Sequence, residues 1–247
     1  MSKLRTFFRD ASFVTMIASS LMPFAYAADR PVIRSAYIEF PPLAYTTESG
    51  ELEGSFIDLT EAIADRAGYD IVWQGLPIER VYLYLEYGEI DMWPGSAGIP
   101  ELAPFIRETD FHTGSIQLNA YSRAGAEPVS EIQDLRGKSL ILIRGYTYFR
   151  LLDHLKEDPD TGITIAPNHL SAIRMLAFER GDYLINFQSP MENSLEISPL
   201  PGLRYDNLLK WPTTLIFSRN APGTDKMLED MNRAWRSMKE EGARVEH

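Results

Sequence analysis

The chain has 247 residues, of which 45% are hydrophobic, and it carries a formal net charge of −11. Such an acidic surface repels phosphate backbones and anionic lipids, so we expect neither nucleic acid nor a membrane surface as a partner. Cysteine is absent, which excludes thiol catalysis, thiolate metal sites and iron–sulfur clusters.

An export signal is predicted at residues 1–27. The segment starts with basic residues, continues with a mostly apolar run at 11–21 and ends in Ala-Tyr-Ala at 25–27, the small-x-small pattern that signal peptidase reads. The apolar run is shorter than the roughly 20 residues that a membrane-spanning helix needs. We therefore expect a soluble mature chain that begins at Ala28 outside the cytoplasm. The alternative, an amphipathic end of a cytoplasmic protein, fits Asp10 but not the cleavage pattern.

The first half of the mature chain alternates strands and helices. The apolar spacing predicts, in order, a strand at 31–38, a helix at 56–67, a strand at 69–73, a helix at 78–87 and a strand at 90–93. Pro41 and Pro42 stop the first strand, while Gly68 and Gly88 close the two helices. This order is typical of a parallel sheet covered by helices.

The same alternation then starts again after a polar turn at 134–138. It predicts strands at 139–143, 163–166, 183–187 and 213–218, and helices at 148–155, 171–180 and 225–241. Two α/β units in one chain imply two lobes.

Several short motifs carry a family resemblance. They are Phe40-Pro41-Pro42-Leu43 with the segment 50–59 that follows it, Gly88-Glu89-Ile90-Asp91, Asp134-Leu135-Arg136-Gly137-Lys138, and Glu179-Arg180-Gly181-Asp182-Tyr183. In this order, behind an export signal, they resemble the family 3 extracytoplasmic solute-binding proteins, the amino-acid-type receptors of ABC transporters. The resemblance covers residues 33–242.

The resemblance implies an α/β fold of the two-lobed periplasmic binding protein-like type (type II), with two crossover strands as the hinge near 117–123 and 213–219. Lobe 1 would comprise residues 28–120 and 216–247, and lobe 2 residues 121–215. A periplasmic, monomeric protein would then capture a small molecule between the lobes for an ABC permease or a membrane sensor. No cofactor and no metal are expected.

The candidate ligand-binding residues follow from strand ends and from the resemblance. In open α/β sheets ligands lie beyond the C-terminal ends of the strands. The candidates are Phe40, Tyr45, Arg80, Trp93, Gly95, Ser96, Arg144, Tyr146, Thr147, Asn186, Phe187 and Gln188. Core or surface packing is an equal alternative for Tyr45 and for Tyr148, which follows Thr147. A solvated helix position is an alternative for Arg80. Arg144 could hold an anionic group, because it lies at a strand end beside a helix start.

Two charged anchors of typical members are missing. The resemblance places Leu102 where an arginine holds the α-carboxylate, and Phe187 where an aspartate holds the ammonium. Removing a buried charge partner costs roughly 3–5 kcal/mol, so a standard α-amino acid should bind poorly. A shift of one residue in the comparison could bring in Arg107 or Asn186 instead.

Two other functions remain open. The resemblance extends to exported dehydratases such as cyclohexadienyl dehydratase, for which Glu39 is the carboxylate to suspect, but no nucleophile–base pair is visible and no catalytic residue is assigned. An orphan interaction protein that has lost its ligand is the third possibility. The four histidines, His112, His154, His169 and His247, are expected to be isolated surface or loop residues, and Asp58, Asp91 and Asp182 to serve turns and helix ends.

Overall fold

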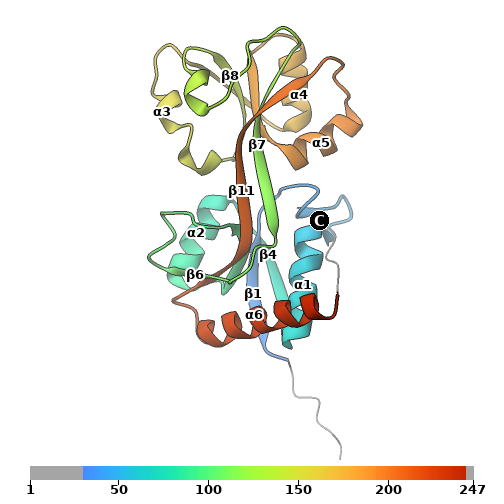
Figure 1. Ribbon diagram of the computed structural model, residues 1–247, viewed down its shortest axis with the longest axis vertical. Helices are drawn as coiled ribbons and strands as arrows, with labels where there is room; N and C mark the ends of the chain where they lie inside the picture. The colour runs from blue at the N-terminus through green and yellow to red at the C-terminus, as the bar shows by residue number, and fades with distance from the viewer. Residues whose placement is uncertain (1–29, 243–247) are drawn as a thin grey trace, which may run out of the picture.

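The computed structural model describes residues 30–242, which form two lobes stacked along the long axis of the molecule (Figure 1). The predicted export signal, its cleavage site and His247 lie outside the described residues.

Lobe 1 is built on three parallel strands. Strand β1 pairs in parallel with β4 and β5. The elements are β1 (Val32–Tyr37), β2 (Tyr45–Thr46), β3 (Leu52–Glu53), α1 (Ser55–Ala67), β4 (Asp70–Gly75), α2 (Ile78–Tyr87), β5 (Met92–Ser96) and β6 (Ile106–Glu108). Helices α1 and α2 end at Gly68 and Gly88, whose φ angles of 87° and 70° are left-handed values that glycine adopts without steric cost.

Lobe 2 repeats this plan, since β8 pairs in parallel with β9 and β10. Its elements are η1 (Ile132–Leu135), β8 (Ser139–Ile143), η2 (Tyr148–Arg150), α3 (Asp153–Lys156), β9 (Gly162–Ala166), α4 (His169–Ala177), β10 (Tyr183–Phe187) and α5 (Gln188–Ile197). Helix α5 was not predicted: it follows β10 directly and has no side-chain cap to mark its start.

Two long strands, β7 (Gly114–Ser122) and β11 (Arg204–Ser218), run side by side between the lobes (Figure 1). Residues 213–217 of β11 pair with β5 in lobe 1, while residues 118–122 of β7 pair with β10 in lobe 2. The ladder is therefore continuous, in the order β4-β1-β5-β11-β7-β10-β8-β9, because the crossover strands pair with each other. The residue limits given above for the lobes remain a prediction.

The predicted helix at 148–155 is wrong for its first half. Tyr148, Phe149 and Arg150 have φ angles of 50°, 54° and 57°, so the chain makes a left-handed turn and becomes α-helical only at Asp153. The cause is a long-range contact: the Tyr148 hydroxyl accepts a hydrogen bond from the Ile143 N–H at 2.7 Å and donates to the Ile185 carbonyl at 3.2 Å. Burial of this ring overrides the local helical pattern.

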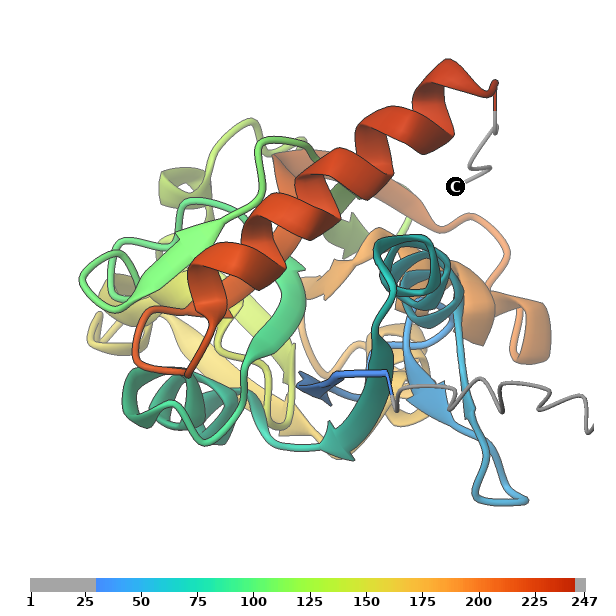
Figure 2. The same cartoon turned by 90° about the horizontal axis from the view of Figure 1, so that it is seen from below.

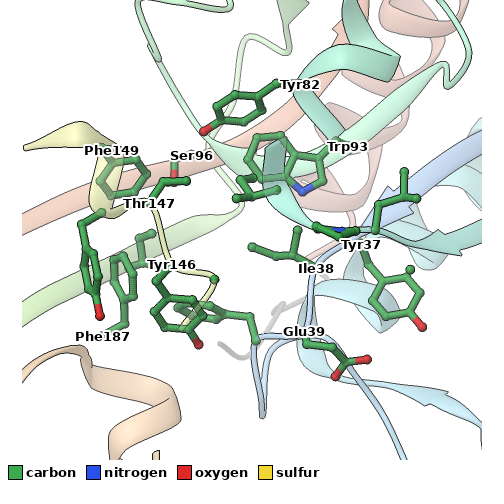
Figure 3. A pocket seen from close by; sticks show the side chains of 18 of the residues that line it. Tyr37, Ile38, Glu39, Tyr82, Trp93, Ser96, Tyr146, Thr147, Phe149 and Phe187 are labelled. Carbon is green, nitrogen blue, oxygen red and sulfur yellow. The ribbon is translucent and has the colours of Figure 1, made fainter. Parts of the chain in front are cut away.

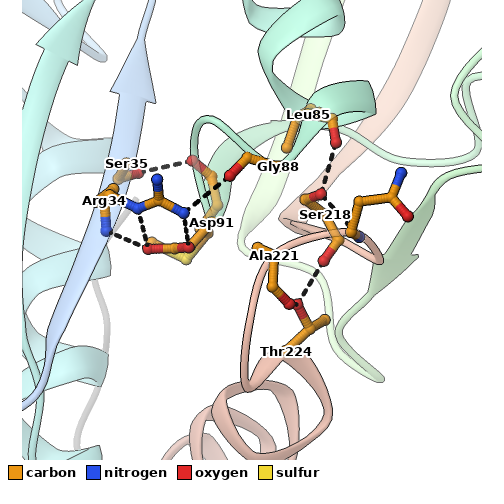
Figure 4. A network of polar contacts seen from close by, with 10 residues as sticks. Arg34, Ser35, Leu85, Gly88, Asp91, Ser218, Ala221 and Thr224 are labelled. Atoms are coloured by element: carbon orange, nitrogen blue, oxygen red, sulfur yellow. Dashed lines mark hydrogen bonds and ion pairs between the residues drawn. The ribbon is translucent and has the colours of Figure 1, made fainter.

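Two carboxylates tie neighbouring strands together, the buried Asp91 in lobe 1 and the exposed Asp182 in lobe 2. Asp91 accepts a hydrogen bond from the Arg34 N–H of β1 at 2.7 Å, and its carboxylate also holds the Arg34 guanidinium (Figure 4). Asp182 accepts in the same way from the Ser139 N–H of β8 at 2.8 Å. These two side chains thus join strands, whereas Asp58 lies in the first turn of α1 as expected.

Helix α6 (Thr224–Glu240) lies across the end of lobe 1 that is remote from lobe 2, beside α1 (Figure 2). Its Met227, Leu228 and Met231 share a buried core with Leu59 and Ile63 of α1. This packing fixes the outer face of lobe 1 and leaves the face toward lobe 2 for a binding cavity.

Candidate functional site

A cavity of about 510 Å³ lies between the lobes. Lobe 1 lines it with residues 37–40 at the end of β1, residues 75–78 between the end of β4 and the start of α2, Tyr82 of α2, and Trp93 and Ser96 of β5. Lobe 2 contributes residues 144–149 after β8 and Phe187 at the end of β10. Ile116 of β7 completes the wall. Parallel strands from both lobes end here, which is where α/β sheets bind ligands.

Eight of the 19 lining residues are aromatic, and some of their rings join the lobes across the cavity (Figure 3). The ring of Phe40, from lobe 1, lies 5.8 Å from that of Tyr146 and 5.2 Å from that of Phe187, both from lobe 2. On the lobe 1 side, the rings of Tyr82 and Trp93 are 5.9 Å apart. Such a wall suits a flat ligand that can stack or meet ring edges.

Trp93 is held in place by Gly95. The Trp93 side chain is almost fully buried, with 3% exposure, and a Cβ atom on Gly95 would lie 2.4 Å from its ring. Only glycine therefore lets the indole lie along the backbone of β5. Among the described residues, the Trp93 Nε1 is a buried donor without a hydrogen-bond partner. Leaving such a group unsatisfied costs roughly 1–3 kcal/mol, so we expect an acceptor atom of a ligand to bond to this N–H.

A chain of hydrogen bonds supports Tyr146 from behind. The Tyr146 hydroxyl lies 3.1 Å from Nε2 of His169, whose Nδ1 lies 3.0 Å from the Asn186 side-chain amide. Burial lowers the pKa of His169 and raises the pKa of Tyr146. His169 is therefore neutral and Tyr146 protonated near pH 7.

The cavity wall has a charged group from each lobe. Glu39 accepts hydrogen bonds from the Thr46 N–H at 3.2 Å and from the Thr46 hydroxyl at 2.6 Å. Arg144 is exposed at the wall, and within residues 30–242 no hydrogen bond or ion pair engages its guanidinium. Tyr82 remains protonated, since burial raises its pKa to about 12.

Most of the predicted strand-end residues come together in the cavity. Those that line it are Phe40, Trp93, Ser96, Arg144, Tyr146, Thr147 and Phe187. Gly95 lies in a small adjoining cavity of about 40 Å³ beneath Trp93, and Asn186 is buried behind Tyr146 and His169. Three candidates lie elsewhere: Tyr45 bonds to Glu53, Gln188 bonds to Glu192, and Arg80 is an exposed residue of α2.

The structure places the two residues that correspond to the charged anchors of the resemblance. Leu102 is fully buried in the core of lobe 1 and does not reach the cavity, whereas Phe187 lines it. Arg107, considered as a substitute for the missing arginine, pairs with Asp225 of α6, away from the cavity. Arg144 is therefore the arginine that lines the cavity in the described part of the chain.

Several lining residues were missed. They are Tyr37, Ile38, Gly75, Leu76, Pro77, Ile78, Tyr82, Ile116 and Phe149, while Glu39, Gly145 and Tyr148 were noted without being assigned to the site. The segment 75–78 follows a correctly predicted strand, so the strand-end rule could have found it. His169 was expected to be an isolated histidine, which is wrong, because its contact with Asn186 joins α4 to β10.

Residues 30–242 contain no group of three or more histidine, aspartate or glutamate side chains that could hold a metal ion. None of their helices is both long and apolar enough to cross a membrane.

Comparisons with known proteins give a family model that matches most of the chain and a distant curated relative. The family model of bacterial extracellular solute-binding proteins, family 3, matches residues 33–246. The probable amino-acid-binding protein YxeM of Bacillus subtilis (strain 168) is 22% identical over 212 residues, which span 81% of this chain and 76% of YxeM.

Solved structures of low sequence identity share the fold. A histidine kinase sensor domain with similarity to periplasmic binding proteins has a TM-score of 0.70 at 20% identity, covering 86% of this chain and 92% of that one. The ancestral amino acid-binding protein AncCDT-1, a precursor of cyclohexadienyl dehydratase, has a TM-score of 0.64 at 16% identity, covering 85% and 90%. Both likenesses support the two-lobed α/β architecture.

Proposed function

Because the chain belongs to the bacterial extracellular solute-binding proteins, family 3, we propose that it captures a small molecule in the cavity between its lobes and presents it to an ABC permease or a membrane sensor. The ligand is not a standard α-amino acid. The observation that carries this proposal is the cavity wall, in which Phe187 packs against Phe40 at the position expected for the aspartate anchor, while Leu102, at the position expected for the arginine anchor, does not reach the cavity.

The cavity supports binding without chemistry. Among the described residues that line the cavity, the one carboxylate is that of Glu39, whose oxygens already accept hydrogen bonds from Thr46. A dehydratase would need a positioned acid or base next to the substrate, and Glu39 is the one candidate. Catalysis is therefore the alternative to the proposed binding function, and incubating the protein with cyclohexadienyl acids while following aromatic product tests it. The binding proposal predicts no turnover.

The remaining assignments extend the same proposal. The protein is exported by a signal at residues 1–27, acts in the periplasm and works as a monomer, with lobe limits at 28–120 plus 216–247 and at 121–215. Cell fractionation tests the location: replacing Ala25 and Ala27 by leucine should leave an uncleaved, membrane-held precursor. A mature protein found in the cytoplasm would contradict the assignment.

A thermal-shift panel tests the ligand proposal directly. Ligand at 100 times its dissociation constant stabilises the folded state by about 2.7 kcal/mol, and each kcal/mol moves the melting temperature of a chain this long by roughly 2–4 °C. We expect no appreciable shift with the standard amino acids at millimolar concentration, and a shift of several degrees with some non-zwitterionic small molecule. A shift of that size with an ordinary amino acid would refute the proposed specificity.

A further inference from the structure

Trp93 lines the cavity, and among the described residues its buried indole N–H has no acceptor. Figure 3 shows the indole nitrogen on the edge of the ring nearest to Ile38. The side chain is 3% exposed, so a water molecule from bulk solvent reaches it poorly. A ligand that fills the cavity can satisfy this donor only with an acceptor atom.

The hydrogen bonds behind Tyr146 leave its hydroxyl hydrogen free. The Phe187 N–H donates to the Asn186 side-chain oxygen at 2.9 Å, which turns the amide nitrogen of Asn186 toward His169. His169 Nδ1 therefore accepts, and the proton of the neutral imidazole is on Nε2, where it is donated to the Tyr146 oxygen at 3.1 Å. Tyr146 can then donate its own hydrogen into the cavity.

The charged groups add to this excess of donors. Arg144 lines the cavity with an uncommitted guanidinium, whereas the opposing carboxylate, Glu39, accepts from Thr46. Trp93, Tyr146 and Arg144 are thus hydrogen-bond donors, and the ligand that complements them has acceptor oxygens and a negative charge.

We propose that the ligand is an aromatic carboxylate without an α-ammonium group. Its ring lies against the packed rings of Phe40, Tyr146 and Phe187, its acceptor oxygen bonds to the Trp93 indole N–H, and Arg144 balances its charge. This inference rests on the proposed binding function and adds the ligand class to it. The cavity of about 510 Å³ falls within the roughly 300–1,000 Å³ of small-molecule sites.

A matched set of probes tests the ligand class. The acids are benzoate, phenylacetate and 3-phenylpropanoate. Phenylalanine differs from 3-phenylpropanoate by its ammonium group, and phenethylamine keeps the ammonium but lacks the carboxylate. At 1 mM, we expect at least one acid to raise the melting temperature by several degrees, and phenylalanine and phenethylamine to leave it within about one degree.

Variants tie this binding to named atoms. Trp93→Phe keeps a ring but removes the N–H, and Arg144→Gln removes the charge. Each should weaken the binding of the best acid at least tenfold in isothermal titration calorimetry. Arg80→Gln, on an exposed position of α2, is the matched control and should bind as the wild type does. The melting temperature of each variant without ligand shows whether it is folded.

The outcomes separate this inference from the function on which it rests. If the acids leave the melting temperature unchanged while an uncharged or cationic compound of a metabolite panel raises it, the ligand class is wrong and the binding function stands. Tight binding of phenylalanine overturns both the ligand class and the proposed specificity. If the whole panel leaves the protein unchanged, solute binding itself fails. Full binding of the best acid by the folded Trp93→Phe and Arg144→Gln variants would also overturn the inference.

Discussion

Asp91→Asn should destabilise the protein because it breaks the strand tie of lobe 1. The Asp91 side chain is 7% exposed, and its carboxylate accepts from the Arg34 backbone N–H at 2.7 Å, from Nε at 3.1 Å and from Nη2 at 2.6 Å. Asparagine keeps an acceptor for the backbone N–H, but its NH₂ group then meets the Arg34 guanidinium, donor against donor.

The size of the effect follows from these contacts. A hydrogen bond to a charged group contributes roughly 1.5–3 kcal/mol, and breaking a fully buried pair costs roughly 3–5 kcal/mol. The Arg34 side chain is 46% exposed, so water replaces part of what it loses. We therefore expect a loss of about 2–3 kcal/mol, which lowers the melting temperature by roughly 4–12 °C for a chain of this length.

The assay is thermal unfolding followed by circular dichroism, with Glu89→Gln as the control. Glu89 is exposed in the same turn, and its substitution makes the same charge change without breaking a described hydrogen bond. It should change the free energy of unfolding by at most about 0.5 kcal/mol. Arg34→Met, made in the wild type and in Asp91→Asn, completes a double-mutant cycle, for which we expect a coupling free energy of at least about 1 kcal/mol. Equal melting temperatures for Asp91→Asn and Glu89→Gln would refute the reasoning.

Three further predictions concern the layer around the cavity. Gly95→Ala should cost about 1–3 kcal/mol and alter tryptophan fluorescence, because the added Cβ would lie 2.4 Å from the indole that covers it; an unchanged spectrum would contradict this packing. Burial lowers the pKa of His169, so the unfolded chain binds a proton more readily and the free energy of unfolding should fall as the pH drops below about 6.5. His169→Gln should flatten that part of the pH profile, and an unchanged slope would count against it. Tyr148→Phe leaves the buried Ile143 N–H without its acceptor and should cost about 1–3 kcal/mol in urea unfolding, so a variant as stable as the wild type would disprove that role.

The helices and strands could be predicted where local pattern and packing agree. Helix α2 was placed at its observed limits because its apolar stripe and the glycine that follows it, Gly88, both mark its end. The helix expected at 148–155 failed because a hydroxyl contact between Tyr148 and two strands, invisible to any local pattern, sets the backbone there. Long-range contacts decide such segments.

The binding site could also be predicted only where local pattern determines the position of a residue. Residues that directly follow strands, such as Phe40 and Tyr146, could be placed in the cavity because parallel strands end at one edge. The supporting layer could not, since His169 matters only through its contacts with Tyr146 and Asn186, which belong to other elements. Whether the indole N–H of Trp93 has a partner likewise depends on three-dimensional packing.

The aromatic wall also changes what the ligand must supply. In a site with charged anchors, the ligand itself bridges the lobes, whereas here Phe40 of lobe 1 already contacts Tyr146 and Phe187 of lobe 2. A ligand shifts a conformational equilibrium only by its difference in affinity for the two states. Since these ring contacts already join the lobes, a ligand with one charge and one acceptor can be sufficient to hold them together. The proposed loss of both amino-acid anchors is therefore compatible with keeping the cavity.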